Sequence, residues 1–478
     1  MHRHAAGAVG LTQQGSDLAL VQRLFDQLRN RILDGVWRHG EKIPGSRNIA
    51  KEAGVSRWTA VTAVEMLLAE GLVQTRKRSG TYVAWEGNGA DFRPAATASS
   101  RSNTAHSLLP FAVGDPGLDL FPMETWRRLQ ARCWKVMPVE ALRAGSDGGW
   151  PDLRAAIAAH VGVTRAITCK PSQVFISTSA HAAVHLAGEI LCRPGTVVWV
   201  EEPGYFRTRA ALQAAGLFPV GVGVDEQGLD VSDGLRLAPK ASMAVTTSSM
   251  QFPTGAILSE TRKKALLDWS ARVGSFILED DYACEFGDAE MASPPLAAMP
   301  NAQRVVYMNT FSTTIFPSLR LSYLIVPVAI ADRFAEALRR TERYATIPNQ
   351  IVLAEFMSSG EFAKHLRVCR EAYAERREAL VAALRDECAG VFAADPAAGG
   401  MHLCAKFKRP TDDIAVGAAA AEAGLIVEPL SRFYGSTPGA SGLLLGFSGH
   451  PPFILRESAR QLARTLAAQV EDCKGIPA

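Results

Sequence analysis

The sequence lacks the features of proteins that are stabilised by disulfides or by a bound metal. It also lacks those of proteins that are secreted or that span a membrane. Its eight cysteines are scattered without a Cys-x-x-Cys pair, which argues against a zinc site or a disulfide framework. No apolar run approaches the ~18 residues of a membrane span, and no long apolar stretch follows the first residues, so neither a membrane anchor nor a secretory signal is expected. These absences predict a protein of the reduced cytoplasm that holds no metal.

Length and charge indicate more than one domain. At 478 residues the chain exceeds the size at which a single hydrophobic core keeps growing. The net charge of +3 is unevenly spread: residues 1–85 hold 12 Lys and Arg against 7 Asp and Glu, whereas the remainder holds 39 against 41. A basic N-terminal segment on a near-neutral body is typical of a nucleic-acid contact.

Residues 17–84 carry the pattern of three helices and a hairpin. Helices are predicted over 17–34, with Ser16 as cap and Gly35 as stop, from near Ser46, and from about Ser56 to Glu70. The buried face of the first helix should consist of Val21, Leu24, Phe25, Leu28 and Ile32. Two short alternating segments, 72–76 and 81–84, follow and are joined by a basic turn at 77–80. Together these elements predict a winged helix-turn-helix over residues 1–85.

The rest of the chain reads as a linker and an α/β domain. Residues 86–107 are rich in Gly, Ala, Ser, Thr and Pro and predict a flexible linker that reaches ~25 Å as a random coil. Beyond it, helical patterns alternate with short β runs, which favours a mostly parallel sheet. The runs lie at 173–177, 196–200, 243–247, 276–278 and 305–307.

The N-terminal motifs occur in an order that resembles the GntR-type winged helix. They read Gly-Glu-Lys-Ile-Pro-Gly-Ser-Arg-Asn-Ile-Ala at 40–50, Gly-Val-Ser-Arg-Trp-Thr at 54–59, Glu-Gly-Leu-Val at 70–73 and Ser-Gly-Thr-Tyr-Val at 79–83. The resemblance implies that the recognition helix begins at Ser56 and that phosphate and base contacts come from one basic and hydroxyl-bearing set. That set is Arg47, Ser56, Arg57, Thr59, Arg76, Lys77 and Arg78. Trp58 stands where the family more often has a small polar residue.

Motifs beyond residue 108 resemble fold-type I aminotransferases, which use pyridoxal phosphate (PLP). They include Pro-Asp-Leu-Arg at 151–154, Val-Glu-Glu-Pro-Gly-Tyr at 200–205, Gln-Phe-Pro-Thr-Gly at 251–255 and Leu-Glu-Asp-Asp-Tyr at 278–282. A GntR-type head on such a body is the arrangement of the MocR subfamily, which the whole chain resembles. The resemblance implies that residues 108–478 bind an effector and dimerise, through a large α/β domain and a smaller C-terminal α+β part.

The resemblance also assigns roles around the cofactor. Asp280 resembles the carboxylate that faces the pyridine nitrogen, Tyr282 the phenol at the ring oxygen, and Tyr205 the aromatic that stacks on the ring. Arg320 resembles the phosphate-binding arginine, assisted by Thr310 and Ser312. Arg207 and Arg432 are candidates by position for binding the carboxylate of an effector.

One position departs from the family in a way that bears on chemistry. Thr313 stands where family members have the lysine that forms the Schiff base, and no lysine occurs between Lys264 and Lys364. A threonine hydroxyl cannot form an imine, and loss of acid–base help alone lowers a rate by ~10²–10⁴-fold. Neighbouring positions also depart, with Ser-Ala-His at 179–181, Asn309 and Ser322. Non-covalent PLP, another ligand and no ligand at all remain open alternatives.

The sequence therefore predicts a dimeric transcription regulator rather than an enzyme. Its partners would be a double-stranded DNA operator and a small molecule of the amino acid, amine or vitamin B6 class, sensed without covalent PLP catalysis. An active PLP-dependent aminotransferase with a DNA-binding head is the alternative. A third alternative is a binding protein with a vestigial pocket that is controlled by protein partners.

Overall fold

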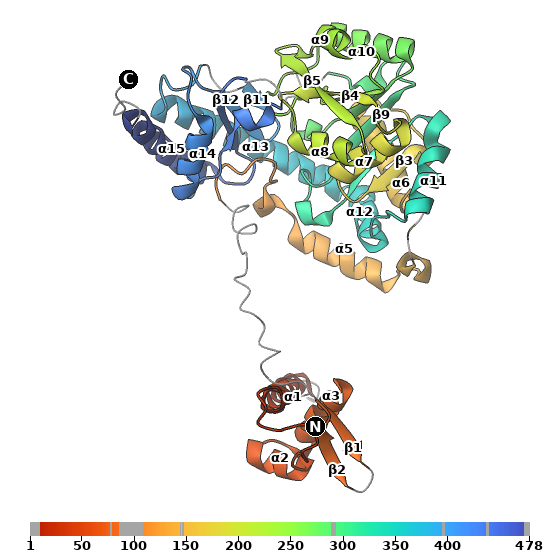
Figure 1. Cartoon of the computed structure of the whole chain (residues 1–478), viewed down its shortest axis with the longest axis vertical. Helices are drawn as coiled ribbons and strands as arrows, with labels where there is room; N and C mark the ends of the chain where they lie inside the picture. The colour runs from red at the N-terminus through yellow and green to blue at the C-terminus, as the bar shows by residue number, and fades with distance from the viewer. Residues whose placement is uncertain are drawn as a thin grey trace, which may run out of the picture. The chain divides into compact units, whose positions relative to one another are not determined.

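The computed structural model divides the chain into two compact units, Met1–Arg101 and Ser102–Ala478. It describes residues 10–76, 79–85, 109–143, 145, 148–287, 293–393, 397–435 and 439–472 (Figure 1). The predicted linker 86–107 and the wing residues Lys77 and Arg78 lie outside the described residues. Among the helices that are described, none is both long and apolar enough to cross a bilayer.

The N-terminal unit is a winged helix with the predicted order of elements (Figure 1). It consists of α1 (Gly10–Leu33), α2 (Ser46–Ala53), α3 (Arg57–Ala69) and the antiparallel pair β1 (Val73–Arg76) and β2 (Gly80–Val83). The five apolar side chains predicted to line the first helix are all buried, at 4% exposure or less. Four of them, all but Val21, form one hydrophobic cluster with Ala60, Ala63 and Leu67 of α3, so the amphipathic stripe supplies much of the core of this unit.

The start of the first helix differs from the prediction. The helix α1 begins at Gly10, so Ser16 lies within it and not at its N-cap. The prediction rested on apolar periodicity, which starts only at Val21. Residues before that point include good helix formers such as Gln13 and Gln14, whose polar side chains carry no periodic apolar pattern. The predicted stop is confirmed, because Gly35 follows the helix with φ 73°.

The C-terminal unit is built around a mixed eight-stranded sheet with the order β3-β10-β9-β8-β7-β4-β5-β6. Its five central strands, β9 to β5, run parallel, whereas β10 and β6 are antiparallel to their neighbours. The mostly parallel sheet is therefore confirmed. The strands are β3 (Val174–Ser177), β4 (Val197–Glu202), β5 (Phe218–Asp225), β6 (Gly228–Leu229), β7 (Met243–Thr246), β8 (Phe276–Asp280), β9 (Val305–Thr310) and β10 (Ser322–Ile325).

Alternation along the strands sorts side chains between the two faces of this sheet. In β8, Leu278 packs with the helices α7 and α11, whereas Ile277 packs with α10 on the other face. The same period places Asp280 with Leu278, and Glu279 with Ile277. The helices of this unit are α5 (Met123–Lys135), α6 (Pro151–Arg165), α7 (Ala180–Leu191), α8 (Phe206–Ala214), α9 (Val231–Leu237), α10 (Glu260–Val273), α11 (Ala331–Thr341) and α12 (Ile347–Ser358).

A smaller antiparallel sheet, β11-β12-β14-β13, forms the C-terminal part. In Figure 1 it lies with α14 and α15 to one side of the eight-stranded sheet, and α13 packs on both α12 and α15. The elements are α13 (Glu361–Glu387), β11 (Ala397–Gly399), β12 (His402–Lys406), α14 (Asp413–Glu422), β13 (Glu428–Pro429), β14 (Gly442–Gly446) and α15 (Pro452–Asp472). This arrangement confirms the predicted division into a large α/β part and a small α+β part.

Candidate functional site

The N-terminus of α3 presents the predicted DNA-reading residues in two different environments. Ser56 is the N-cap of this helix, and its Oγ accepts a hydrogen bond of 3.0 Å from the backbone N–H of Thr59. The hydroxyl of Thr59 lies 2.8 Å from the same Oγ, and Thr59 is only 2% exposed. The structure therefore places Thr59 in the helix cap and beneath the surface, and its contact with DNA stays a prediction.

The other described residues of the predicted DNA-binding set have exposed side chains on α3, on α2 and on the hairpin. Arg57 is exposed, and Trp58 is 57% exposed beside it. Arg47 is exposed on α2. At the wing, the Arg76 guanidinium lies 4.5 Å from the centre of the Tyr82 ring, which holds this cation on the hairpin surface.

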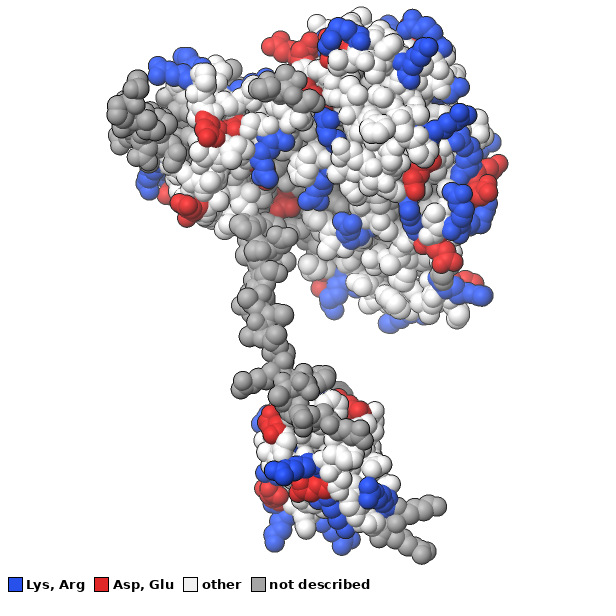
Figure 2. Space-filling model, in the orientation of Figure 1, with Lys and Arg blue, Asp and Glu red and all other residues white. Residues whose placement is uncertain are grey.

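Charge on the N-terminal unit is mixed on the face drawn in Figure 2, where Lys and Arg side chains are interspersed with Asp and Glu. Some acids of this unit pair with bases: Arg29 contacts Glu70 at 3.0 Å, and Arg31 contacts Glu52 at 3.1 Å. Basic residues in such pairs are less available to phosphate. The cations of the predicted DNA-binding set that the structure describes have no such acidic partner in the ion pairs found.

The C-terminal unit contains a cavity of about 530 Å³ at the carboxyl ends of the parallel strands. All six residues predicted to hold the cofactor line it: Tyr205, Asp280, Tyr282, Thr310, Ser312 and Arg320. Thr313 and Arg207 line it as well. Arg432 does not; its guanidinium lies 3.4 Å from Glu428 and is largely exposed. No lysine occurs among the described residues that line this cavity.

Two carboxylates form the inner end of the cavity. Burial raises the pKa of Asp280 to about 7, with Asp281 and Glu201 adding to the effect through their charge. Burial also raises the pKa of Glu201, although several donors oppose this. Glu201 accepts hydrogen bonds from Thr246, from the backbone and hydroxyl of Thr247, and from Gln251. The inner end of the cavity is therefore acidic, and these hydrogen bonds hold the Glu201 carboxylate in position.

Three polar atoms at this inner end have no hydrogen-bond partner among the described residues. They are Oδ1 of Asp280, the hydroxyl of Tyr282 and Oγ1 of Thr313, and all three are buried. Thr313 as a whole is 8% exposed. Buried polar atoms without partners cost free energy unless a ligand or water satisfies them. Their convergence on one cavity indicates a binding site for a polar small molecule.

Aromatic rings form the wall of the cavity. Tyr205 contacts Phe252 edge to face, with the ring centres 5.4 Å apart, and Phe252 contacts Tyr282 in the same way at 5.7 Å. Tyr205 is 39% exposed, so one side of its ring is free to stack on a ligand. The wall therefore suits a planar ring.

The opposite end of the cavity is suited to an anion. The first turn of α7 lines it, and Ser179 caps that helix by accepting from the N–H of Ala182 at 3.1 Å. Arg320 lines the same cavity, and its backbone lies in the left-handed region, with φ 54°, a conformation uncommon for a residue with a side chain. The hydroxyl of Thr310 orders the loop by accepting from the N–H of Ser312 at 3.2 Å.

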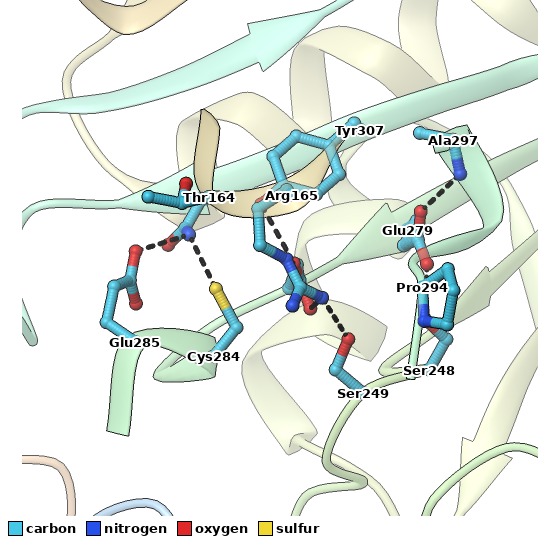
Figure 3. A network of polar contacts seen from close by, with 12 residues as sticks. Thr164, Arg165, Ser248, Ser249, Glu279, Cys284, Glu285, Pro294, Ala297 and Tyr307 are labelled. Carbon is cyan, nitrogen blue, oxygen red and sulfur yellow. Dashed lines mark hydrogen bonds and ion pairs between the residues drawn. The ribbon is translucent and has the colours of Figure 1, made fainter. Parts of the chain in front are cut away.

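A buried polar network lies on the other face of β8 (Figure 3). Arg165, from the end of α6, donates two hydrogen bonds to Asp281, at 2.8 and 3.1 Å, and one to Ser249 at 2.6 Å. The hydroxyl of Tyr307 donates to Asp281 at 2.8 Å. Glu279 accepts from the backbone N–H of Leu296 and Ala297. These bonds hold the strand that carries Asp280.

Sequence reasoning did not identify several of these residues. Glu201 falls inside a recognised motif, but only the structure shows that it lies beside Asp280. His181 also lines the cavity, with Nδ1 3.1 Å from the carbonyl of Arg207. Arg165 and Asp281 are 116 residues apart, so no local pattern joins them. No cluster of three or more His, Cys, Asp or Glu side chains that could hold a metal ion is found in the described part of the chain.

Comparison with known proteins gives the same two-part organisation. Residues 20–83 match the family of bacterial regulatory proteins of the gntR type, and residues 107–440 match aminotransferase class I and II. The probable rhizopine catabolism regulatory protein MocR of Rhizobium meliloti is 33% identical over 97% of this chain and 96% of its own length. The HTH-type transcriptional regulator TauR of Rhodobacter capsulatus is 31% identical over 95% of this chain and 97% of its own length.

A solved structure agrees with the fold of the C-terminal unit. LysN, the α-aminoadipate aminotransferase of Thermus thermophilus, superposes with a TM-score of 0.69 and 25% identity, over 78% of this chain and 96% of its own. The chain is thus a GntR winged helix fused to an aminotransferase class I and II domain. It belongs to the MocR-type family of GntR transcription regulators.

Proposed function

We propose that this protein is an operator-binding regulator whose aminotransferase-like domain senses a small molecule that it holds without a covalent bond. The observation that carries the proposal is Thr313, which contributes a buried, unpartnered hydroxyl to a cavity lined by no lysine in the described residues. A hydroxyl cannot form the imine on which PLP-dependent amino-group transfer depends. The cavity then serves binding rather than turnover.

The remaining residues of the cavity suit a vitamin B6 phosphate. Asp280 supplies an anion for a ring nitrogen, the Tyr205 face supplies a stacking surface, and Arg320 with the first turn of α7 supplies an anion site. When bound, pyridoxal phosphate supplies an electron-withdrawing ring and a reactive aldehyde. The LysN structure holds N-(5'-phosphopyridoxyl)-L-leucine, a vitamin B6–amino acid conjugate, in a domain of the same fold. Non-covalent ligands of this class are therefore the first to test.

Dimerisation is part of the proposal. Tyr205 lines the cavity and is 39% exposed, and its neighbour Phe206 is 51% exposed, so a second copy could complete the wall at this exposed end. Paired winged helices would read paired half-sites on one operator.

The DNA-binding half is tested with the full-length protein and a labelled fragment from the upstream region of its own gene. Arg57→Ala should weaken specific binding by roughly tenfold, since one good base contact contributes about 1–3 kcal/mol of discrimination. Wild-type affinity should fall steeply with salt. Arg127→Ala is the matched control, because Arg127 is an exposed arginine of the C-terminal unit that pairs with Glu124. An affinity for the DNA fragment that changes neither with Arg57→Ala nor with ionic strength would contradict the proposal.

The sensing half is tested by ligand-dependent melting and by chemistry. Vitamin B6 forms, amino acids and amines are added singly to the full-length protein, and at least one should raise the melting temperature of the C-terminal unit. Borohydride treatment after pyridoxal phosphate should leave the peptide that contains Thr313 unmodified. Amino-group exchange between an amino acid and a keto acid would instead identify an enzyme.

A further inference from the structure

The inner end of the cavity holds more negative than positive charge. Asp280 and Glu201 both line it, and the charge of Glu201 raises the pKa of Asp280. Neither carboxylate has a cationic partner among the ion pairs of the described residues. A positively charged group of a ligand would therefore be favoured at this end.

The arginines that line or approach the cavity do not supply this charge. Arg209 pairs with Glu202 at 3.0 Å, and Arg207 and Arg320 are exposed at the rim. Arg165 binds Asp281 on the other face of β8. The basic groups thus lie at the rim or are already paired, whereas the acids lie at the inner end.

Thr313 adds an acceptor where a lysine would add a cation. Its Oγ1 is buried and unpartnered, and so is the hydroxyl of Tyr282, which lines the same cavity. The threonine side chain reaches three atoms less far from Cα than that of lysine, and it carries no charge. An ammonium group on the ligand would donate to these hydroxyls and would restore the positive charge that threonine lacks.

We propose that the cavity selects the aminated form of the vitamin, pyridoxamine 5'-phosphate, over the aldehyde. The inference rests on the proposed function, since it names the ligand of the same non-covalent site. The aminomethyl group of pyridoxamine phosphate carries a positive charge at neutral pH, whereas the aldehyde of pyridoxal phosphate is neutral. The phosphate and the ring, with the nitrogen that Asp280 would face, are common to both forms, so the hydroxyl of Thr313 makes the distinction.

Three vitamin B6 phosphates that differ in the charge of one ring substituent, and little in size, test whether charge or shape determines the affinity. Pyridoxamine 5'-phosphate, pyridoxine 5'-phosphate and pyridoxal 5'-phosphate are titrated calorimetrically into the full-length protein. Pyridoxine phosphate has a neutral hydroxyl in place of the ammonium and nearly the same size. We expect the amine to bind about tenfold or more tightly than the alcohol, since hydrogen bonds to a charged group are about twice as strong as neutral ones. Binding of the aldehyde should be weaker than that of the amine and fully reversible.

Thr313→Lys should reverse this selectivity. Its Nζ would condense with the aldehyde, forming a C=N bond with loss of water, and its charge would repel the ligand amine. We expect pyridoxal phosphate to become fixed by borohydride and the affinity for the amine to fall by about tenfold. Thr313→Met, with similar bulk and no amine, is the control: it should not become fixed to pyridoxal phosphate by borohydride, and without the Thr313 hydroxyl it should lose most of the preference for the amine over the alcohol.

The outcomes distinguish the inference from the proposed function. Equal affinities of the wild type for amine and alcohol, or no binding of any vitamin B6 form, would overturn the inference. The sensor proposal would then be decided by whether an amino acid or an amine raises the melting temperature of the C-terminal unit. A covalent adduct of pyridoxal phosphate at the wild-type cavity would overturn both.

Discussion

Asp280 and Asp281 are adjacent carboxylates with opposite surroundings. Asp281 is buried and accepts hydrogen bonds from Arg165 and Tyr307. Asp280 faces the cavity, and one of its carboxylate oxygens has no hydrogen-bond partner among the described residues. The period of β8 separates them, because successive side chains of a strand point to opposite faces. One acid therefore fixes the strand, and its neighbour is left available to a ligand.

The pH dependence of stability should report on Asp280. Its folded pKa is raised to about 7, mainly by burial, against about 3.9 in an unfolded chain. The folded protein thus keeps a proton that the unfolded chain loses, so this contribution to stability is complete below pH ~4 and is lost as pH rises through ~7. Calorimetric melting across this range should show the wild type losing stability relative to Asp280→Asn. Parallel curves would contradict the assignment.

The buried ion pair should be costly to break. Asp281→Asn leaves the Arg165 guanidinium, whose side chain is 12% exposed, without its counter-charge. We expect the C-terminal unit to lose about 3–5 kcal/mol of unfolding free energy, measured by urea denaturation. Glu124→Gln breaks an exposed pair with Arg127 and should lower the unfolding free energy far less. Similar losses in the two variants would mean that the network does not stabilise β8.

At the scale of elements, the cap of α3 is the clearest target. Removing the Ser56 hydroxyl takes away the acceptor of the Thr59 N–H, which costs about 1 kcal/mol in typical N-caps. Ser56→Ala should therefore speed hydrogen exchange in the first turn of α3, whereas Glu65→Gln, on the exposed face of the same helix, should not. Unchanged exchange in Ser56→Ala would show that the cap does not hold this turn.

Elements with a strong local pattern were predictable from the sequence, and those without one were not. The stripe from Val21 to Ile32 identified α1, but its polar first turns carry no such pattern, so the predicted start was wrong. Family motifs identified Asp280 and Arg320, since each motif lies on one loop or strand end. The contact between Arg165 and Asp281 joins α6 to the end of β8, and only the tertiary fold brings them together.

At the scale of the whole molecule, the proposed dimer makes a prediction about the operator. Two winged helices that bind one face of the duplex need half-sites separated by whole helical turns of ~10 base pairs. After the operator has been mapped by footprinting, an insertion of about 5 base pairs between its half-sites should weaken binding more than one of about 10 base pairs. Equal effects of the two insertions would contradict paired reading by a dimer.

The central claim is that the body of this regulator holds its ligand without a covalent bond at Thr313. Its most direct test is to incubate the full-length protein with pyridoxal phosphate, reduce with borohydride and map every modified peptide by mass spectrometry. The account predicts that residues 305–320, which contain no lysine, stay unmodified and that the cavity ligand is removed on denaturation. A phosphopyridoxyl adduct on any residue that lines the cavity would contradict it.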